Sequence, residues 1–233
     1  VNHADHVFWL GVTSADYFLQ IRTSNIEIDN YRRGLPLERQ MFVPIPIPNQ
    51  KIKNDMNCDN IYLLSTGTTY KYTPNENYNF LNEIFKVVDK HSNVIFNVVG
   101  IPKDNPYAQK YSHERIIYHG IISIEELKKI EEITDIYVEG FPMSSFTALL
   151  QVSLQKIPFI LHYKPLNIFK LFKESIENDI KYPENLISWH NEIDNLITKN
   201  RYRKRVAENQ FSFVKNNYDI SSWKRRINDL EIK

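Results

Sequence analysis

Two short polar stretches of the sequence carry residue types that suit the binding of phosphate. The stretch STGTTYK at residues 65–71 combines hydroxyl side chains with one glycine and a lysine, and residues 142–147 bring two serines and a threonine to the start of a helix-like segment. A helix N-terminus presents unpaired backbone N–H groups and partial positive charge, which attract phosphate, and a lysine adds a point charge. The candidate diphosphate ligands are Thr68, Lys71, Ser144, Ser145 and Thr147.

Each stretch also has a plain structural interpretation. Serine and threonine are common N-caps of helices, and a lysine on a surface loop is ordinary. The ligand interpretation gains weight because both stretches follow predicted strands, and the carboxyl ends of parallel strands meet at one edge of a sheet. The sequence contains neither GxGxxG nor GxxxxGK(S/T), which disfavours a dinucleotide-dependent dehydrogenase and a P-loop NTPase. A phosphorylated ligand held without either motif favours a nucleotide-sugar enzyme.

Strand-like and helix-like segments alternate from residue 61 onward. The predicted strands are 61–65, 93–100, 115–120, 135–140, 157–161 and 186–190. The predicted helices are 78–91, 123–133, 145–155, 191–200, 201–218 and 221–231. Ser123 and Glu126 fit a capping box at the start of the second of these helices. The alternation predicts an α/β fold, a Rossmann-like parallel sheet with helices on both faces.

The chain divides into segments of different character. Residues 44–60 are interpreted as an interdomain linker, because alternating prolines impose extended geometry and a polar run follows. Residues 1–43, which begin at Val1, hold one strand–helix–strand unit that is too small to bury a core alone. We expect them to be the tail of an N-terminal domain that this chain mostly lacks. Residues 61–218 then form the main domain, and 219–233 a C-terminal helix.

The amino-acid composition limits the cellular locations and the classes of binding partner expected for this protein. A net charge of +1 and a pI of about 7.9 do not suit a dedicated nucleic-acid binder. The sequence has no apolar run of the ~20 residues that a membrane helix needs, and no basic-then-apolar leader is visible. Cys58 is the only cysteine, which excludes an internal disulfide and favours a cytoplasmic setting. Basic clusters at 201–205 and 224–226 are interpreted as solvated helix faces, with peripheral contact to an anionic membrane as the alternative.

Glycine and histidine residues gather at the predicted strand ends. Four of the six glycines come at or just after the end of a strand: Gly67, Gly100, Gly120 and Gly140. Glycine allows a ligand to approach the backbone closely, but strand ends also need turns, so both explanations stay open. His119 and His162 follow strands too, where they either line a cleft or are ordinary polar residues of a strand end.

Three stretches resemble the donor-binding domain of GT-B glycosyltransferases. They are LSTGTTYKYTP, RIIYHGIISIEEL and DIYVEGFPMSSFTALLQVSLQKIPFIL, and they span about residues 61–161. Within that fold they are most similar to the O-linked N-acetylglucosamine transferases and the bacterial cytosolic N-glycosyltransferases. The resemblance implies the C-terminal, nucleotide-sugar-binding half of a GT-B fold, with residues 1–43 as the end of an N-terminal acceptor domain.

The resemblance also implies roles for individual residues. Thr68, Lys71 and Thr147 fall where the family contacts the donor diphosphate, and Ser144 and Ser145 lie in its phosphate-binding loop. The implied nucleoside-binding residues are His119, Ile122 and Gln151. The residues expected beside the sugar or in the cleft are His162, Gly67 and Pro142.

The sequence departs from the family pattern at several positions. Gln151 stands where the family usually has an acidic residue on the donor ribose, and Ser144 and Ser145 replace loop glycines. Many retaining enzymes of this fold carry a Glu-x7-Glu pair; here Glu139 is present, but the second position is Thr147. These changes favour an inverting reaction and keep open a degenerate, non-catalytic site.

An inverting transferase needs a base for the acceptor and groups that stabilise the leaving diphosphate. The candidate catalytic residues in the N-terminal piece are His3, Asp5 and His6. The sequence has no Asp-x-Asp motif and no His/Cys cluster with metal-ligand spacing. We therefore expect no essential metal, and no cofactor, since the nucleotide sugar is a substrate.

These features predict a glycosyltransferase that moves a hexosyl or N-acetylhexosaminyl group from a nucleotide-diphosphate sugar, expected to be UDP-linked. The acceptor would be a glycan, a lipid-linked molecule or a protein, in bacterial polysaccharide biosynthesis. One alternative is a non-catalytic nucleotide-sugar or glycan-binding module. Another is a nucleotide-sugar epimerase on the same fold, which would need a second buried base.

Overall fold

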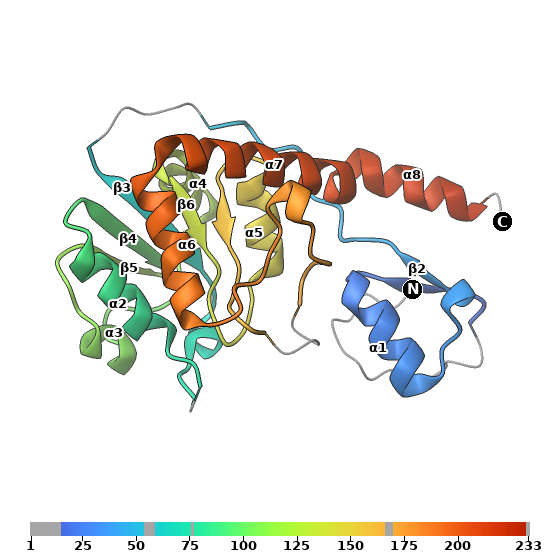
Figure 1. Cartoon of the computed structure of the whole chain (residues 1–233), viewed down its shortest axis with the longest axis horizontal. Coiled ribbons are helices and arrows are strands. Elements are labelled where there is room, and N and C mark those ends of the chain that lie inside the picture. The colour runs from blue at the N-terminus through green and yellow to red at the C-terminus, as the bar shows by residue number, and fades with distance from the viewer. Residues whose placement is uncertain (1–14, 54–58, 76, 166–169, 232–233) are drawn as a thin grey trace.

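A parallel sheet forms the centre of the main domain (Figure 1). The computed structural model describes residues 15–53, 59–75, 77–165 and 170–231. Within these residues the sheet has five strands in the order β5-β4-β3-β6-β7, and every pair is parallel. The strands β3 to β7 are Ile61–Thr66, Val94–Val99, Ile116–Gly120, Ile136–Val138 and Phe159–Ile160. This architecture confirms the predicted Rossmann-like α/β fold.

Strand β3 lies at the middle of the sheet and sets its register. It pairs with β4 along its whole length, from Ile61 opposite Val94 to Thr66 opposite Val99. All of its residues are buried except Tyr62, which is half-buried, as expected for a strand covered on both faces. Because the strands run parallel, the segments that follow β3, β4 and β6 all leave from the same edge of the sheet.

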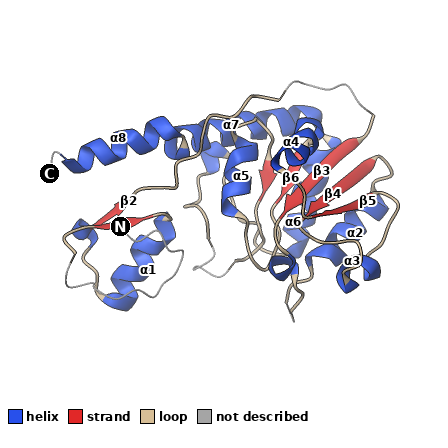
Figure 2. Ribbon diagram, turned by 180° about the vertical axis from the view of Figure 1, so that it is seen from behind, coloured by secondary structure: helices blue, strands red, loops and turns tan. Residues whose placement is uncertain are grey.

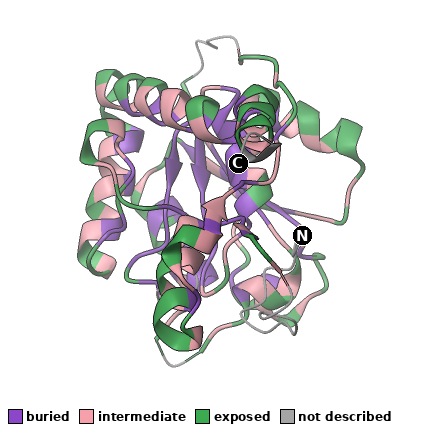
Figure 3. Cartoon of the chain, turned by 90° about the vertical axis from the view of Figure 1, so that its right-hand side faces the viewer, coloured by how far each residue is buried: buried purple, intermediate pink, exposed green. Residues whose placement is uncertain are grey.

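Helices cover both faces of the sheet (Figure 2). The helices of one face are α2, α3 and α6, with bounds Phe80–Lys90, Pro106–Lys110 and Leu186–Thr198. The helices of the other face are α4, α5 and α7, with bounds Ile124–Ile133, Phe146–Ser153 and Asn200–Tyr218. Each face has its own hydrophobic cluster, and Figure 3 shows the strands as the buried centre between them. The predicted helices on both faces are thereby confirmed.

The segment LISWH at residues 186–190 opens helix α6, so the prediction of a sixth strand there is wrong. Asn185 Oδ1 accepts a hydrogen bond from Ser188 N at 2.9 Å, and Ser188 Oγ accepts one from Asn185 N at 3.1 Å. Trp189 and Ile193 recur at helical spacing and are fully buried. A short apolar run fits a strand or a buried helix equally well, and here the capping box starts a helix.

Residues 18–42 form the strand–helix–strand unit that the sequence predicts. The elements β1, α1, η1 and β2 are Phe18–Gln20, Thr23–Arg33, the 3-10 helix Leu37–Arg39, and Gln40–Phe42, and β1 pairs with β2 in parallel. The centre of the unit is polar, because Gln20 Nε2 donates to Asp29 Oδ2 at 2.7 Å and to Gln40 Oε1 at 3.0 Å, all buried. The assignment of this unit to a larger N-terminal domain stays a prediction.

The start of the predicted linker lies against the main domain. Ile47 is 1% exposed, and its N donates to Tyr218 O, at the end of α7, at 3.0 Å. Lys53 Nζ lies 3.0 Å from Asp135 Oδ1, just before β6. Residues 44–53 are therefore attached to the main domain at both of these points.

Helix α8 (Ile220–Glu231) follows α7 and extends toward β1 and β2 (Figure 1). The guanidinium carbon of Arg226 lies 4.9 Å from the ring centroid of Phe42, which joins α8 to the N-terminal unit. Among the described residues, no helix combines the length and the apolar character needed to cross a membrane.

Candidate functional site

The two polar stretches meet at the carboxyl edge of the sheet. Residues 65–71 leave β3 and residues 142–147 follow its neighbour β6. Lys71 Nζ donates to Ser144 O and to Ser145 Oγ, each at 3.2 Å, and Met143 N donates to Lys71 O at 3.3 Å. The contact predicted from the sheet topology is thus present, while the role of these residues toward a ligand stays a prediction.

The 3-10 helix η2 (Thr69–Tyr72) orients the first stretch. Lys71 N donates to Thr68 O at 2.9 Å, which closes the turn. Tyr72 points inward: its ring is 2% exposed and its hydroxyl lies 3.1 Å from Ser65 Oγ. The Tyr72 side chain is anchored inside the domain. The side chain of the preceding residue, Lys71, therefore points toward residues 142–147 and contacts Ser144 and Ser145.

Three of the four strand-end glycines are required by packing. A Cβ on Gly140 would lie 2.5 Å from the Tyr72 ring, and one on Gly67 would lie 2.9 Å from Ser145 Oγ. A Cβ on Gly100 would lie 2.0 Å from Gly67 O, and Gly100 has φ +99°, in the region that favours glycine. Close packing therefore accounts for these three glycines, while approach of a ligand to Gly67 stays a prediction.

The N-terminus of α5 is not held by an ordinary serine cap. In the part of the chain that the structure describes, Ser145 stands at the N-cap without a side-chain hydrogen bond to the helix backbone, and its Oγ accepts from Lys71. Ser145 N donates instead to Glu139 Oε1. Thr147 lies on the exposed side of the first turn. The α5 terminus is therefore bound to a lysine and a carboxyl group from the sheet edge.

Glu139 lies at the end of β6 and is fully buried. Burial raises the pKa of its carboxyl to about 8, against the opposing effects of the Ser145 N–H and of the charges on Lys71 and Arg22. Glu139 Oε2 has no hydrogen-bond partner among the described residues. Arg22 belongs to the N-terminal unit, directly before α1, so that unit contributes charge to the site. The sequence shows an acidic residue directly after the apolar run DIYV. It gives no sign that Arg22 lies near that residue in the folded chain.

The implied nucleoside-binding residues occupy two places near this edge. His119, at the end of β5, is half-buried and its Nε2 lies 2.8 Å from Asn97 Oδ1; burial and then the charge of Lys103 lower the pKa of His119. Ile122 precedes the predicted capping box of α4, which is confirmed. Gln151 lies one helical turn after Thr147 on α5 and is half-buried.

His162 lies inside an aromatic cluster at the end of β7. Its ring stacks on Phe141 with centroids 5.2 Å apart and meets the edge of Tyr78 at 4.7 Å. Neither ring nitrogen has a hydrogen-bond partner among the described residues, and burial lowers the pKa of His162 to about 4. Contact with a sugar would require this cluster to open. Pro142, a further residue expected in the cleft beside Gly67, is half-buried and follows a cis peptide bond.

The remaining site predictions are not tested by this geometry. His3, Asp5 and His6 lie outside the described residues. Among the residues that are described, no group of three or more His, Cys, Asp or Glu side chains gathers as metal ligands would. The expectation of a metal-independent, cofactor-independent reaction stays a prediction.

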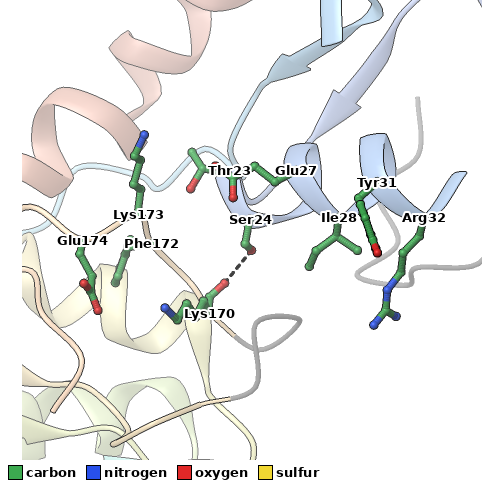
Figure 4. A pocket seen from close by; sticks show the side chains of 10 residues that line it. All are labelled: Thr23, Ser24, Glu27, Ile28, Tyr31, Arg32, Lys170, Phe172, Lys173 and Glu174. Atoms are coloured by element: carbon green, nitrogen blue, oxygen red, sulfur yellow. Dashed lines mark hydrogen bonds between the residues drawn. The ribbon is translucent and has the colours of Figure 1, made fainter. Parts of the chain in front are cut away.

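A hollow of about 800 Å³ lies between α1 and the segment 170–174 (Figure 4). Ser24 Oγ donates to Lys170 O at 2.9 Å across it, and side chains of both charges line it, including Arg32 and Glu174. The sequence carried no sign of this hollow, because the two segments that form it are far apart along the chain.

The basic clusters near the C-terminus make structural contacts. Arg203 donates to Leu196 O at 2.8 Å at the end of α6, and Arg205 pairs with Asp179 at 2.7 Å. These bonds give the cluster at 201–205 contacts within the fold, and the interpretation of both clusters as solvated helix faces stays a prediction. Contact with a membrane stays a prediction.

Comparisons with known proteins place the fold. No protein-family model matches the chain, and no curated protein matches it. HepE from Anabaena, solved with UDP and glucose, aligns with a TM-score of 0.68 and 10% identity over 94% of this chain and 63% of HepE. The lipopolysaccharide outer core galactosyltransferase WaaB aligns with a TM-score of 0.64 and 16% identity over 93% of this chain and 62% of WaaB.

A third similar structure is a single C-terminal domain and shows which half of the fold this chain resembles. The C-terminal domain of the group 1 glycosyl transferase LpcC from Francisella tularensis aligns with a TM-score of 0.57 and 16% identity, over 75% of this chain and 99% of that domain. The chain spans less than two thirds of the length of HepE and WaaB. None of these three is named as an O-linked N-acetylglucosamine transferase or a protein N-glycosyltransferase, so that subgroup stays a prediction. The chain has the α/β fold of the C-terminal, Rossmann-like half of GT-B glycosyltransferases.

Proposed function

We propose that this chain is the donor-binding part of a glycosyltransferase that uses a nucleotide-diphosphate sugar, with UDP as the nucleotide. The observation that carries the proposal is the bond from Lys71 to Ser144 and Ser145 at the start of α5. It puts an ammonium group beside a helix N-terminus at the carboxyl edge of a parallel sheet, where such folds bind ligands. The complexes of HepE with UDP and with UDP-glucose support the choice of nucleotide.

The chemistry of the site is stabilisation of a leaving diphosphate. Lys71, with the hydroxyl groups of Thr68, Ser145 and Thr147, neutralises or donates to phosphate oxygens as the glycosidic bond breaks. Ser144 holds Lys71 in position, because its backbone carbonyl accepts a hydrogen bond from the ammonium group. His119, Ile122 and Gln151 are proposed to receive the nucleoside. The transferred group is a hexosyl or N-acetylhexosaminyl unit.

The acceptor side of the reaction is proposed on sequence grounds. The acceptor is a glycan, a lipid-linked molecule or a protein, and the base that deprotonates it is His3, Asp5 or His6. The departure from the Glu-x7-Glu pattern at Thr147 favours inversion. These parts of the proposal are tested by activity of the full-length protein.

The decisive experiment compares Lys71→Ala with the wild type. Loss of a charge-assisted contact to phosphate is worth about 1.5–3 kcal/mol, so UDP should bind roughly 10- to 100-fold more weakly. Isothermal titration calorimetry measures the affinity, and product analysis with UDP-sugars measures transfer. Lys224→Ala, at an exposed lysine on α8, is the matched control and should bind UDP as the wild type does. Unchanged UDP affinity in Lys71→Ala would contradict the assignment of this site.

A non-catalytic nucleotide-sugar-binding module is the second candidate. Two observations favour it: Gln151 replaces the usual acidic residue, and Glu139 occupies the Ser145 N–H that a phosphate could use. If UDP raises the melting temperature while full-length protein neither transfers nor hydrolyses any UDP-sugar, this candidate replaces the first.

A further inference from the structure

Glu139 places a buried carboxyl group in the proposed diphosphate site. Its Oε1 accepts from Ser145 N, the backbone N–H immediately before α5. The same serine receives Lys71 through its Oγ at 3.2 Å. Glu139 thus shares Ser145 with the lysine on which the proposed function depends.

The ionic state of this carboxyl decides the charge that a diphosphate meets. A carboxylate beside the helix start would repel the phosphate oxygens and compete with them for Lys71 and the Ser145 N–H. A protonated carboxyl removes that repulsion. It still accepts from Ser145 N through one oxygen, and its O–H becomes a donor. Glu139 Oε2 has no hydrogen-bond partner among the described residues and is itself buried, so the neutral acid acts on a bound diphosphate by removing a nearby negative charge and not by direct contact.

The surroundings of Glu139 come from four parts of the molecule. Lys71 and Tyr72 approach from η2, Tyr137 lies on β6, Arg22 precedes α1, and Tyr182 follows the segment 170–174. The two cations favour the carboxylate, and burial favours the neutral acid. Burial raises the pKa of all three tyrosines above the usual value of 10, so these hydroxyl groups stay neutral over the range in which Glu139 titrates.

We propose that Glu139 is a positioning residue that couples diphosphate binding to its own protonation. The carboxyl is neutral when a diphosphate occupies the site, and binding in alkaline solution takes up one proton from solvent onto Glu139. This inference rests on the proposed function, since it concerns the same site. It adds a regulation: donor affinity falls as the solution becomes alkaline.

Calorimetry with UDP tests the coupling. A group that titrates near pH 8 is about nine-tenths ionised at pH 9, so wild-type affinity for UDP should fall roughly 10-fold between pH 7 and pH 9. Titrations at pH 9 in two buffers of different ionisation enthalpy should report uptake of nearly one proton. Glu139→Gln keeps the shape and stays neutral, so it should bind UDP equally at both pH values without proton uptake.

Glu177→Gln is the matched control, because Glu177 is an exposed carboxylate outside the site. It should show the wild-type dependence on pH. The proton-uptake measurement on the wild type needs no variant and holds even if Glu139→Gln does not fold. UDP binding by the wild type that is equal at pH 7 and pH 9 and releases or takes up no proton would overturn this inference alone. Absence of UDP binding by the wild type at both pH values would overturn the proposed function, and this inference with it.

Discussion

The ends of two neighbouring strands, β6 and β7, carry buried titratable side chains in opposite surroundings. Glu139 after β6 accepts a backbone hydrogen bond and feels the charges of Lys71 and Arg22. His162 after β7 is enclosed by aromatic rings, with no hydrogen-bond partner among the described residues. Burial disfavours the charged form of both groups, which raises the pKa of Glu139 to about 8 and lowers that of His162 to about 4.

We interpret the difference between the two regions in terms of the proposed binding of a ligand. Around Glu139 the chain gathers one backbone hydrogen-bond donor and the positive charges of Lys71 and Arg22. Around His162 it gathers apolar rings that fill space and exclude water. Phe141 links the regions: it follows Glu139 by two residues and stacks on His162. We interpret the first region as the binding edge and the second as the packing that supports it.

Removal of Phe141 should have the largest effect on stability. The side chain is 0% exposed and contacts Phe80 and Trp189 as well as His162, and truncation of a buried Phe typically costs about 3–5 kcal/mol. Phe141→Ala should lower the free energy of unfolding by that amount in urea titrations. Ile176→Ala, at a side chain that is 90% exposed, should change it by less than about 0.5 kcal/mol. Equal effects of the two variants would mean that Phe141 does not join the two regions.

The carboxyl of Glu139 should make the protein less stable as pH rises. The folded state keeps a proton up to about pH 8, while the unfolded state loses it near the ordinary value of 4.5. Stability from this group is therefore full below pH 4.5 and is lost as pH rises to 8, by an amount of the order of a few kcal/mol. Glu139→Gln should lack that loss, and melting temperatures measured from pH 4.5 to 9 would show it. A wild-type curve parallel to that of Glu139→Gln would count against the buried neutral acid.

The imidazole of His162 should make the protein less stable as pH falls. The unfolded chain binds a proton near pH 6.5, whereas the folded state resists until about pH 4. Stability from this group is full above pH 6.5 and is lost as pH falls toward 4, by about 2–3 kcal/mol. His162→Phe removes the titration and fits an aromatic cluster, so its melting temperature should fall less in acid. A variant as acid-sensitive as the wild type would show that His162 does not titrate in this way.

Replacement of Lys71 should have the smallest effect on stability. Its two hydrogen bonds are partly exposed, so screening by solvent reduces the contribution of each to about 1 kcal/mol or less. Lys71→Ala should therefore unfold at nearly the wild-type urea concentration while it loses UDP affinity. A large loss of stability would instead assign Lys71 to the packing of the edge.

Local chemistry accounts for most of what could be predicted from the sequence. Apolar runs buried on both faces made β3 and β4 recognisable, and the Ser123–Glu126 capping box began α4 where expected. The parallel order of the strands then required the polar stretches after β3 and β6 to be neighbours. Each of these inferences depends on residues that are close in the sequence or on the rules of strand connection.

Tertiary structure decided the rest, because the deciding contacts join segments that the sequence keeps apart. Residues 186–190 are a helix because a capping box starts it and Trp189 packs into the face that α2 also covers. Arg22 affects a carboxyl more than one hundred residues away, and His162 is enclosed by rings from several segments. The sequence determined most of the elements, the segment 186–190 excepted, and which strand ends share an edge. Burial and charge at that edge, which depend on every segment packed there, were set only by the folded chain.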